Sequence, residues 1–594
     1  MPRQLERFPN LVTMFFTRAA ERGDSPFLWT KQDGAWVATS WAEAARQVAS
    51  LAAGLTAIGL KRGDRVMLVS ENRPEWCLSD LAIMAAGCVT VPTYVTNTER
   101  DHLHIIENAG ACAIIVSTAK LARTLLPAVL RSNQAQIVIG LEDTRVPASI
   151  AFHNWHALIA AHPTTPEAAA ARATFTRDDL ACIIYTSGTG GAPRGVMQHH
   201  GAILHNCAGC TTVISEDFGW GDEVFLSFLP LSHAYEHTGG QHFPISLGGQ
   251  IYYAEGLEKL AANIEETRPT IMFVVPRLFE VLRTRISKTI EKQGGASAYL
   301  LARALDIGGK RYAGKLRLID RPMQAAVATL FKPKIAKKFG GRLKAMISGG
   351  APLNPEVGLF FESIGLTFLQ GYGQTEAAPV ISCNRPAAGV RMDSVGPPLK
   401  DTEVRIAEDG EILVRGELVM HGYWRNDAET ANVLKDGWLH TGDVGEIDDK
   451  GRIRITDRKK DLIINDKGDN VAPQKVEGML TLQPEIAQAM IAGDRRPYMV
   501  ALVVPDPEWT QSWCAANGNA CSFASLAENS AYRTAIGHAI ERVNTDLTVT
   551  ERVRRFVLAD GPFTIENEQL TPSLKIRRHV LRAAYGDRLT ALYK

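Results

Sequence analysis

The chain contains 594 residues, 45% of them hydrophobic and 22% charged, and its formal net charge is +1. This length exceeds what one hydrophobic core usually organises, so we expect two or more globular domains. The near-neutral charge argues against a nucleic-acid binder, because such proteins carry a basic excess.

The N-terminal segment lacks the apolar run of a signal peptide, and no run of about 18 apolar residues predicts a spanning helix. The nine cysteines are scattered and odd in number, which favours reduced thiols. Cys207 and Cys210 form one C-x-x-C pair, and without a second pair we expect buried or helical cysteines rather than a metal site. These features predict a cytoplasmic protein.

Helical and strand patterns alternate from the N-terminus to about residue 180, and similar strand patterns recur further along the chain. Such alternation is typical of an α/β fold with mainly parallel sheets flanked by helices. The predicted helices are 40–60, 74–86 and 99–109, and the predicted strands are 65–69, 88–93, 112–117, 225–229, 270–275, 343–348 and 367–369.

The pattern changes near Asp393, where short alternating segments such as 403–406 and 411–415 are separated by glycines. We expect a small antiparallel, barrel-like subregion over 393–457. After a charged cluster, a strand over 498–504 lies among helical patterns. The sequence therefore predicts a large N-terminal domain over 1–457 and a small, mobile α+β domain over 458–594.

The stretch 185–196 reads Y-T-S-G-T-G-G-A-P-R-G-V and follows an apolar strand. Glycines let backbone N–H groups turn inward, so a loop with hydroxyls and the cation Arg194 suits phosphate. It is not a Walker A loop, which needs a lysine next to a hydroxyl residue. A glycine-rich turn that binds nothing is the alternative for this loop alone.

Three further turns offer groups that a nucleotide needs. Glu376 ends the run G-Y-G-Q-T-E over residues 371–376, and a carboxylate beside a triphosphate suits Mg²⁺. The glycine turn 348–352 suits close approach of a flat base. Asp443, in the run W-L-H-T-G-D, could accept hydrogen bonds from a ribose diol. Each of these could also be a surface turn, and Lys575 in the run T-P-S-L-K could belong to a basic tail.

These motifs, in this order, resemble the signature set of the adenylate-forming (AMP-binding) superfamily over about residues 10–590. Within it, the runs L-P-L-S-H-A-Y-E, D-R-K-K-D-L-I and N-V-A-P-Q, with the insert between Arg277 and Gly341, resemble long-chain fatty acid–CoA ligases. The resemblance implies activation of a fatty acid by ATP to acyl-AMP with release of pyrophosphate. Transfer to coenzyme A would then give acyl-CoA and AMP. A homodimer is a further family-level expectation.

The resemblance also implies roles for residues. Lys575 would bridge the carboxylate and α-phosphate oxygens, and His233 would lie beside the reacting carboxylate, although a core histidine is the alternative. Thr186 and Glu376 would hold Mg²⁺, and Asp443 would bind the ribose hydroxyls with help from Arg458. The ATP and AMP contacts would come from Thr186, Ser187, Gly188, Thr189, Gly190, Arg194, Gly350, Ala351, Gly371, Tyr372, Gly373, Thr375, Asp443 and Arg458.

Lys460 sits where the family has its hinge. After adenylation the small domain would rotate about it, so that Gly468, Asp469 and Asn470 approach the coenzyme A thiol.

The chain departs from the family pattern at three positions. Gly190 replaces a threonine, Arg194 replaces a lysine, and Ile464 stands where many relatives have a lysine. Because arginine is planar and bidentate, the phosphate geometry should differ, and a lysine-assisted thioester step at position 464 is put in doubt.

The insert 283–344 holds 16 basic and three acidic residues, a local charge of +13, together with apolar helical runs over 299–307 and 325–331. A basic amphipathic surface suits anionic lipid headgroups, which would make the protein peripheral on the inner face of a membrane. A solvated helical face or a patch for coenzyme A phosphates are the alternatives.

Other functions remain open at this stage. A fatty acyl-AMP ligase that delivers to a carrier protein shares the first half-reaction, as does a medium-chain or aryl acid–CoA ligase. A non-catalytic nucleotide or lipid sensor is more remote, because Glu376, Asp443 and Lys575 are all present. The acyl chain length cannot be derived from the motifs.

Overall fold

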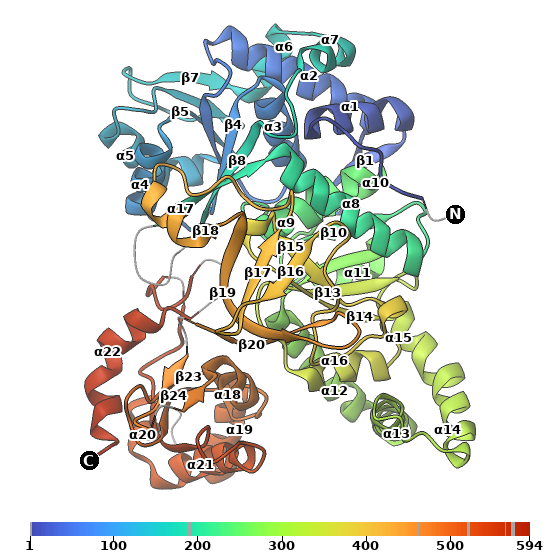
Figure 1. The fold of residues 1–594 in the computed structure, drawn as a ribbon, viewed down its shortest axis with the longest axis vertical. Coiled ribbons are helices and arrows are strands. Elements are labelled where there is room, and N and C mark those ends of the chain that lie inside the picture. The colour runs from blue at the N-terminus through green and yellow to red at the C-terminus, as the bar shows by residue number, and fades with distance from the viewer. Residues whose placement is uncertain are drawn as a thin grey trace.

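The computed structural model describes residues 3–186, 193–459, 462–467, 469–518, 523–564, 566–571 and 576–594. Two large, mostly parallel sheets with flanking helices form the main body, a five-stranded antiparallel sheet lies beside them, and an α+β unit follows (Figure 1). The α/β class with an antiparallel region is thus confirmed.

The first sheet has seven strands and forms the upper half of Figure 1. All neighbours in it are parallel except the last two, which form an antiparallel hairpin. Its order is β7 (Ala151–Asn154), β6 (Ile137–Gly140), β5 (Ala111–Val116), β3 (Arg65–Val69), β4 (Val89–Thr93), β8 (Leu180–Thr186) and β9 (Arg194–His199). The helices around it are α2 (Trp41–Ala57), α3 (Pro74–Ala85), α4 (Glu99–Ala109), α5 (Ala119–Arg131), α6 (Trp155–Ala161) and α7 (Pro166–Arg172).

The second sheet has eight strands, parallel in the middle and antiparallel at both ends. Its order is β15 (Val380–Cys383), β14 (Phe368–Gly373), β13 (Ala345–Ser348), β12 (Ile271–Val274), β10 (Val224–Ser227), β11 (Gln250–Tyr253), β1 (Pro26–Gln32) and β2 (Ala35–Ser40). Its helices are α1 (Leu11–Arg22), α8 (His200–Asp217), α9 (Ala234–Glu236), α10 (Phe243–Leu247), α11 (Leu260–Thr267), α12 (Pro276–Gln293), α13 (Gly295–Tyr312), α14 (Arg321–Ala326), α15 (Lys332–Lys338) and α16 (Pro355–Ser363).

One hydrophobic core joins the two sheets and includes residues of α1, α2, α3, α8 and α10. In it, Phe27 of β1 stacks on Trp41 of α2 with ring centroids 3.7 Å apart, and both side chains are fully buried. Aromatic side chains of this size contribute much of the burial energy of a core. The first two strands of the chain, β1 and β2, belong to the second sheet, although β3 to β9, which follow them in sequence, form the first.

Local sequence explains where several helices begin. Ser40 accepts a hydrogen bond from the Glu43 backbone N–H at the start of α2. Thr98 and Asp101 form a reciprocal capping box before α4, which ends at Gly110 with φ 65°. Caps of this kind satisfy backbone groups that have no partner within the helix, which fixes the helix ends.

The antiparallel sheet contains β16 (Glu403–Ile406), β17 (Glu411–Arg415), β18 (Leu434–Lys435), β19 (Trp438–Ile447) and β20 (Ile453–Arg458), with α17 (Asp427–Val433) before β18. The final unit contains β21 (Ile463–Ile464), β22 (Asn470–Val471), α18 (Pro473–Leu480), β23 (Ile486–Ala492), β24 (Met499–Pro505), α19 (Pro507–Asn517), α20 (Phe523–Glu528), α21 (Ser530–Asn544), β25 (Val553–Leu558) and α22 (Arg578–Ala591).

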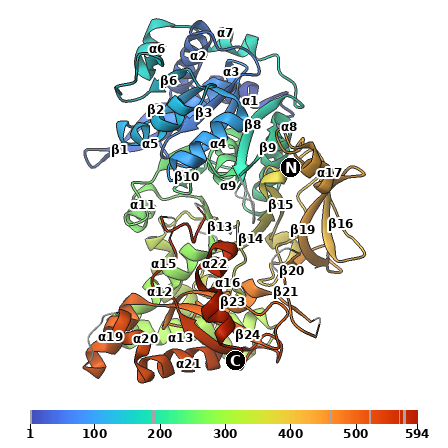
Figure 2. The same ribbon diagram turned by 90° about the vertical axis from the view of Figure 1, so that its left-hand side faces the viewer.

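The C-terminal unit packs its own core on both faces of the β23–β24–β25 sheet. Figure 2 shows this unit beside the helices of the second sheet, and Lys288 of α12 forms an ion pair with Glu508 of α19 at 2.5 Å. The domain boundary between residues 457 and 458 stays a prediction. The last strand of the antiparallel sheet, β20, ends at Arg458.

The basic insert is helical, but one predicted helix is divided. The run 299–307 lies within α13, as expected. The run 325–331 begins in α14 and continues as a π-helical turn, Val327–Phe331. In such a turn the hydrogen bonds join residues five apart in sequence instead of four. Cys207 and Cys210 both lie on α8 as free cysteines, the first buried and the second half-buried, as the sequence predicted.

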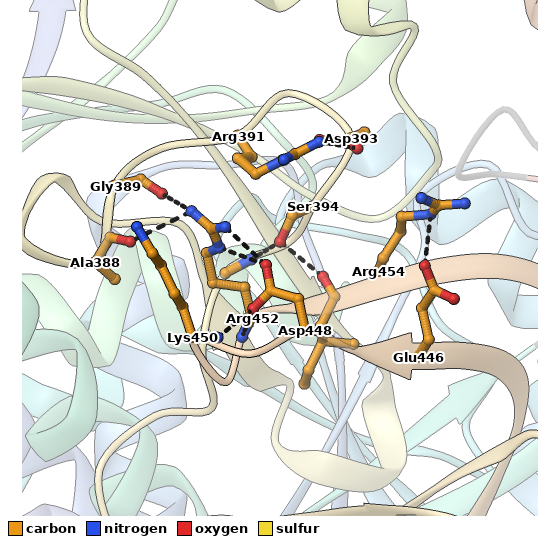
Figure 3. A network of polar contacts seen from close by, with 12 residues as sticks. Ala388, Gly389, Arg391, Asp393, Ser394, Glu446, Asp448, Lys450, Arg452 and Arg454 are labelled. Atoms are coloured by element: carbon orange, nitrogen blue, oxygen red, sulfur yellow. Dashed lines mark hydrogen bonds and ion pairs between the residues drawn. The ribbon is translucent and has the colours of Figure 1, made fainter.

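Figure 3 shows how the β19–β20 hairpin is attached to the segment 388–394. Arg452 is buried, and its guanidinium donates to Asp448 at 2.8 Å and to the Gly389 carbonyl at 3.0 Å. Beside it, Ser394 donates to the Ile453 carbonyl at 2.8 Å. These contacts hold the antiparallel sheet, which carries Asp443, against the main body.

We expect Arg452→Leu to lower the melting temperature by several degrees, because the Gly389 carbonyl and Asp448 lose a buried donor. Thermal unfolding followed by circular dichroism measures this shift. The matched control is Arg454→Leu in the same hairpin, since the ion pair of Arg454 with Glu446 is exposed and should contribute little. Equal shifts for the two variants would contradict the role given to Arg452.

Candidate functional site

The predicted site residues gather where the main sheets meet the antiparallel sheet. The second sheet presents the carboxyl ends of β13 and β14 there, as open α/β sheets do at their ligand sites. The β8–β9 hairpin of the first sheet reaches the same place, because Gln198 of β9 donates to the Thr375 carbonyl at 2.7 Å. Residues 421–424 run beside β9, with Trp424 N–H donating to the Gly195 carbonyl at 2.7 Å.

Asp443 lies at the centre of a buried polar cluster. The Tyr372 hydroxyl donates to one carboxylate oxygen at 2.7 Å, and Arg458 Nε donates to the other at 2.9 Å. Asp443 and Arg458 are opposite each other on β19 and β20, while Tyr372 comes from β14. Burial, together with the Asp443 carboxylate, raises the pKa of the Tyr372 phenol well above its usual value. The phenol therefore keeps its proton and remains a donor.

The structure thus brings together Asp443, Arg458 and Tyr372, three residues that the sequence assigned to ribose and adenine. A carboxylate held by two donors keeps one orientation and still has lone pairs for further hydrogen bonds. Such a group can accept hydrogen bonds from a vicinal diol. Tyr372 belongs to the strand itself, as do Gly371 and Gly373, whereas the sequence placed all three in a turn after it.

Glu376 lies in a second cluster with three residues from two other segments. The Tyr423 hydroxyl donates to Glu376 Oε1 at 2.8 Å, and the Arg194 guanidinium lies 4.5 Å from the centre of the Tyr423 ring. Arg194 also forms an ion pair with Glu429 of α17. Burial, together with Glu376, raises the pKa of Tyr423, so its phenol stays protonated and donates.

Arg194 is the first residue of β9 and pairs with Thr186, the last residue of β8. The sequence had placed this arginine in the loop itself. Its contact with Glu429 means that a phosphate would have to share or replace the carboxylate of Glu429. Tyr423 and Glu429 were missed by the sequence analysis, and the only signal for them was an aromatic pair after Gly422 in the antiparallel region.

If Glu376 holds Mg²⁺, as the resemblance implies, Tyr423→Phe should raise the Mg²⁺ concentration needed for half-maximal activity by about threefold to tenfold, because the Glu376 carboxylate loses a hydrogen bond of roughly 1 kcal/mol. Pyrophosphate release measured against Mg²⁺ concentration tests this shift. Tyr498→Phe is the control, since that phenol donates to the Leu592 carbonyl in the C-terminal unit. A Tyr423→Phe protein with an unchanged Mg²⁺ requirement would contradict a link between Tyr423 and the metal ion expected at Glu376.

The glycines near the site are required for different structural reasons. A Cβ on Gly373 would lie 1.8 Å from the Pro379 carbonyl oxygen, so only glycine fits there. Gly350 has φ 83°, no atom of the described residues lies within 4 Å of a Cβ built on it, and it is exposed with Ala351 after β13. This open turn leaves room for a flat group beside the backbone. Thr375 and Glu376 form a short 3-10 turn after β14.

His233 caps the N-terminus of α9 and is half-buried. Its Nδ1 accepts a hydrogen bond from the Tyr235 backbone N–H at 3.2 Å. With Nδ1 engaged in this way, Nε2 is the nitrogen that carries the proton in the neutral ring. His233 therefore has a fixed orientation at the start of a helix.

Several predicted site residues lie outside the described part of the chain: Ser187, Gly188, Thr189, Gly190, Lys460, Gly468 and Lys575. Asp469 and Asn470 are described and lie at the β21–β22 turn, where the Asp469 backbone N–H donates to Asn465 at 2.8 Å. Asn470 is exposed. Their predicted approach to coenzyme A stays a prediction.

Two family models match the chain: AMP-binding enzyme over residues 15–424 and AMP-binding enzyme C-terminal domain over residues 460–594. Among curated proteins, the long-chain-fatty-acid–CoA ligase FadD15 of Mycobacterium tuberculosis is 31% identical, covering 98% of this chain and 97% of its own. Long chain acyl-CoA synthetase 1 of Arabidopsis thaliana is 28% identical, covering 100% of this chain and 92% of its own.

Solved structures share the fold. The adenylation domain of a carboxylate reductase from Mycobacterium chelonae has a TM-score of 0.77 at 23% identity, covering 99% of this chain and 92% of its own. The corresponding domain from Segniliparus rugosus, solved with AMP and a co-purified carboxylic acid, has a TM-score of 0.76 at 22% identity, covering 99% and 94%. With both family models matched in order, the chain belongs to the AMP-binding enzyme family and is an adenylate-forming ligase.

Proposed function

We propose that the protein activates a long-chain fatty acid with ATP and transfers the acyl group to coenzyme A. Similarity at 31% identity over 98% of the chain to a long-chain-fatty-acid–CoA ligase is the observation that carries the choice of substrate and acceptor. The Tyr372–Asp443–Arg458 cluster beside Glu376 supports the nucleotide half of the reaction.

In the first step, a carboxylate oxygen of the fatty acid forms a bond to the α-phosphorus, and the bond to pyrophosphate breaks. Asp443 would hold the ribose hydroxyls, and the turn at Gly350 and Ala351 would border the base. The loop Ser187–Gly190 and Arg194 would hold the β- and γ-phosphates. Lys575 would stabilise the charge that develops on the oxygens around the α-phosphorus.

Glu376 and Thr186 are the residues that would hold Mg²⁺. Carboxylate and hydroxyl oxygens are the ligands that this ion prefers, and Tyr423 orients the Glu376 carboxylate. When bound, Mg²⁺ supplies charge neutralisation for the leaving pyrophosphate. Glu376 is fixed from its backbone as well, since its carbonyl accepts from the Met420 N–H at 2.9 Å.

In the second step, the coenzyme A thiolate forms a bond to the acyl carbon, and AMP leaves with the bonding electron pair. Rotation of the C-terminal unit about Lys460 would withdraw Lys575 and bring Asp469 and Asn470 toward the thiol. His233, at the start of α9, would lie beside the acyl carboxylate throughout.

Product analysis separates this proposal from the alternatives. The enzyme is incubated with ATP, Mg²⁺ and palmitate, with and without coenzyme A, and thioester and free AMP are measured by mass spectrometry. We expect palmitoyl-CoA and AMP in equal amounts only when coenzyme A is present. Enzyme-bound acyl-AMP that does not react with coenzyme A would contradict this acceptor and favour a carrier protein.

The basic insert also supports contact with an anionic membrane surface, where long-chain acids gather. Leu318 and Ile319, on the 3-10 turn between α13 and α14, are 73% and 80% exposed. Among the large apolar side chains that the structure describes, these two are the most exposed. Basic residues flank them on both sides, and α13 and α14 lie at the lower right edge of Figure 1. None of the described helices is long and apolar enough to cross a bilayer.

We expect the double variant Leu318→Ser/Ile319→Ser to lose about tenfold of its binding to phosphatidylglycerol vesicles, because two apolar side chains no longer enter the interface. Vesicle flotation measures the binding. Val549→Ser, which removes a side chain 69% exposed in the C-terminal unit, is the control. Two results would contradict contact with an anionic membrane: wild-type protein that binds phosphatidylcholine vesicles as strongly as anionic vesicles, and wild-type protein that binds neither.

A further inference from the structure

Two histidines and an aspartate that belong to none of the predicted site residues meet in the core. Asp80 comes from α3, and His237 and His242 come from the helical turn between α9 and α10. Asp80 Oδ2 lies 3.0 Å from His237 Nε2 and 3.5 Å from His242 Nε2, and the two Nε2 atoms are 3.3 Å apart. All three side chains are fully buried. Three ligand atoms thus form a nearly equilateral triangle.

The backbone conformation brings the two histidines together. Residues His237–His242 form a π-helical turn within an otherwise α-helical segment. In an α-helix, side chains five residues apart point in directions about 140° apart, given 3.6 residues per turn. The wider π turn brings positions 237 and 242 to one face, with their rings 4.7 Å apart at 82°. Turns of this kind are rare and are frequently found at functional sites.

The dimensions of the triangle fit a metal ion. Zn²⁺ binds histidine nitrogen and carboxylate oxygen at about 2.0–2.2 Å, so neighbouring ligands of a tetrahedral site lie about 3.3–3.5 Å apart. Two of the three observed separations, 3.5 and 3.3 Å, lie in this range, and the third, 3.0 Å between Asp80 Oδ2 and His237 Nε2, is slightly shorter. Gln241 supplies a fourth group, because its side-chain amide lies 2.6 Å from Asp80 Oδ2 and 3.5 Å from His242 Nε2. An amide turned over would present its oxygen instead.

Buried polar atoms without a hydrogen-bond partner also support a cation at this triangle. Asp80 Oδ1 and Gln241 Oε1 are buried and have no hydrogen-bond partner among the described residues. A cation at the triangle would compensate a carboxylate that is otherwise enclosed in the core.

We propose that Asp80, His237 and His242, with Gln241 as the fourth ligand, form a structural site for a divalent transition-metal ion, with Zn²⁺ as the first candidate. The ion would link α3 to the helical segment that begins directly after His233. It would thereby fix the histidine predicted to lie beside the acyl carboxylate. This site is independent of the Mg²⁺ predicted at Glu376 and of the identity of the acyl substrate.

Because the three ligands are fully buried, the ion must enter before the fold closes. The full-length protein is therefore isolated from cells grown with added Zn²⁺, and separately refolded from denaturant with Zn²⁺, with Co²⁺ or with a chelator. Metal content is measured by mass spectrometry after removal of loosely bound ions. We expect about one Zn²⁺ per chain, visible absorption typical of tetrahedral Co²⁺ after refolding with cobalt, and a lower melting temperature after refolding with chelator.

The variants Asp80→Asn and His237→Gln are expected to lower the metal content to about a tenth of the wild-type value, since each removes one charged or imidazole ligand. His102→Gln is the matched control: this histidine is equally buried, on α4, and its Nδ1 has no partner in the described structure. If wild-type protein contains no stoichiometric ion after growth and refolding with metal, and melts at the same temperature with chelator, the cluster is only an internal hydrogen-bond network. Equal metal loss in His102→Gln would also overturn the proposal.

Discussion

Lys575→Ala should reduce the formation of acyl-AMP by about 10²–10³-fold, which is the usual cost of removing one group that stabilises developing charge. Pyrophosphate release with ATP, Mg²⁺ and palmitate measures this step. The same variant should still convert acyl-AMP, supplied from outside, to thioester at close to the wild-type rate. This difference follows because Lys575 would leave the site before coenzyme A reacts.

The matched control is Lys475→Ala. Lys475 belongs to the same C-terminal unit and forms an ion pair with Glu551 at 2.7 Å, with its own side chain half exposed. Removing it should change neither half-reaction. Lys460→Pro should give the opposite pattern to Lys575→Ala, with adenylation kept and thioester formation lost, because a proline would stiffen the hinge. Equal loss of both half-reactions in Lys575→Ala would contradict the proposed alternation.

Asp443→Asn is expected to lower kcat/KM for ATP by about 10²-fold, which corresponds to about 3 kcal/mol. The carboxylate accepts from Tyr372 on one oxygen and from Arg458 on the other. An amide can satisfy only one of these donors, and its NH₂ group would face the other. The ribose hydroxyls would then meet a site that is both misaligned and less able to accept hydrogen bonds.

Asp448→Asn provides the control for this prediction. Asp448 lies in the turn that joins the same two strands, and its partner is Arg452 (Figure 3). Its loss should lower stability and leave kcat/KM for ATP unchanged. An Asp443→Asn enzyme with wild-type kinetics, or an equal kinetic loss in both variants, would contradict the assignment of Asp443 to ribose.

Elements defined by local signals were predicted well from the sequence. The helix over 99–109 and the strands over 403–406 and 411–415 have the bounds that the sequence indicated. Thr98, Asp101 and Gly110 explain the first of these, because a capping box and a left-handed glycine mark both ends of the helix. Alternating apolar residues between glycine turns explain the strands.

The division of the parallel strands into two sheets was not predictable in the same way. Strand β1 pairs with β11, more than 200 residues later in the chain, and β9 turns back on β8 as an antiparallel strand. Neither pairing has a local signal, since the partners are chosen by packing across the core. The strand at 367–369 also continues to Gly373, because the glycines permit pairing close to β15.

The candidate nucleotide site likewise contains residues that local sequence indicated and residues that only the tertiary contacts reveal. Glu376 and Asp443 stood out as carboxylates in glycine-containing runs that resemble family motifs, although either could have belonged to a surface turn. The structure places Asp443 within β19 and not in the turn that the sequence indicated. Tyr423 and Glu429 did not, because their importance comes from contacts with Glu376 and Arg194, which are distant in sequence. The cluster of Asp80, His237 and His242 was also missed, since its spacing of five residues fits neither a helix nor a strand and becomes meaningful only in a π turn.

The most direct measurement is pyrophosphate release with ATP and Mg²⁺ over a series of acids from acetate through laurate and palmitate to oleate, with and without coenzyme A. Wild-type protein should release pyrophosphate with the long-chain acids, far less with acetate, and form thioester only when coenzyme A is added. Lys575→Ala should abolish the release. Release that is greatest with acetate or with an aryl acid would contradict the long-chain assignment. No release with any acid would contradict acid activation itself.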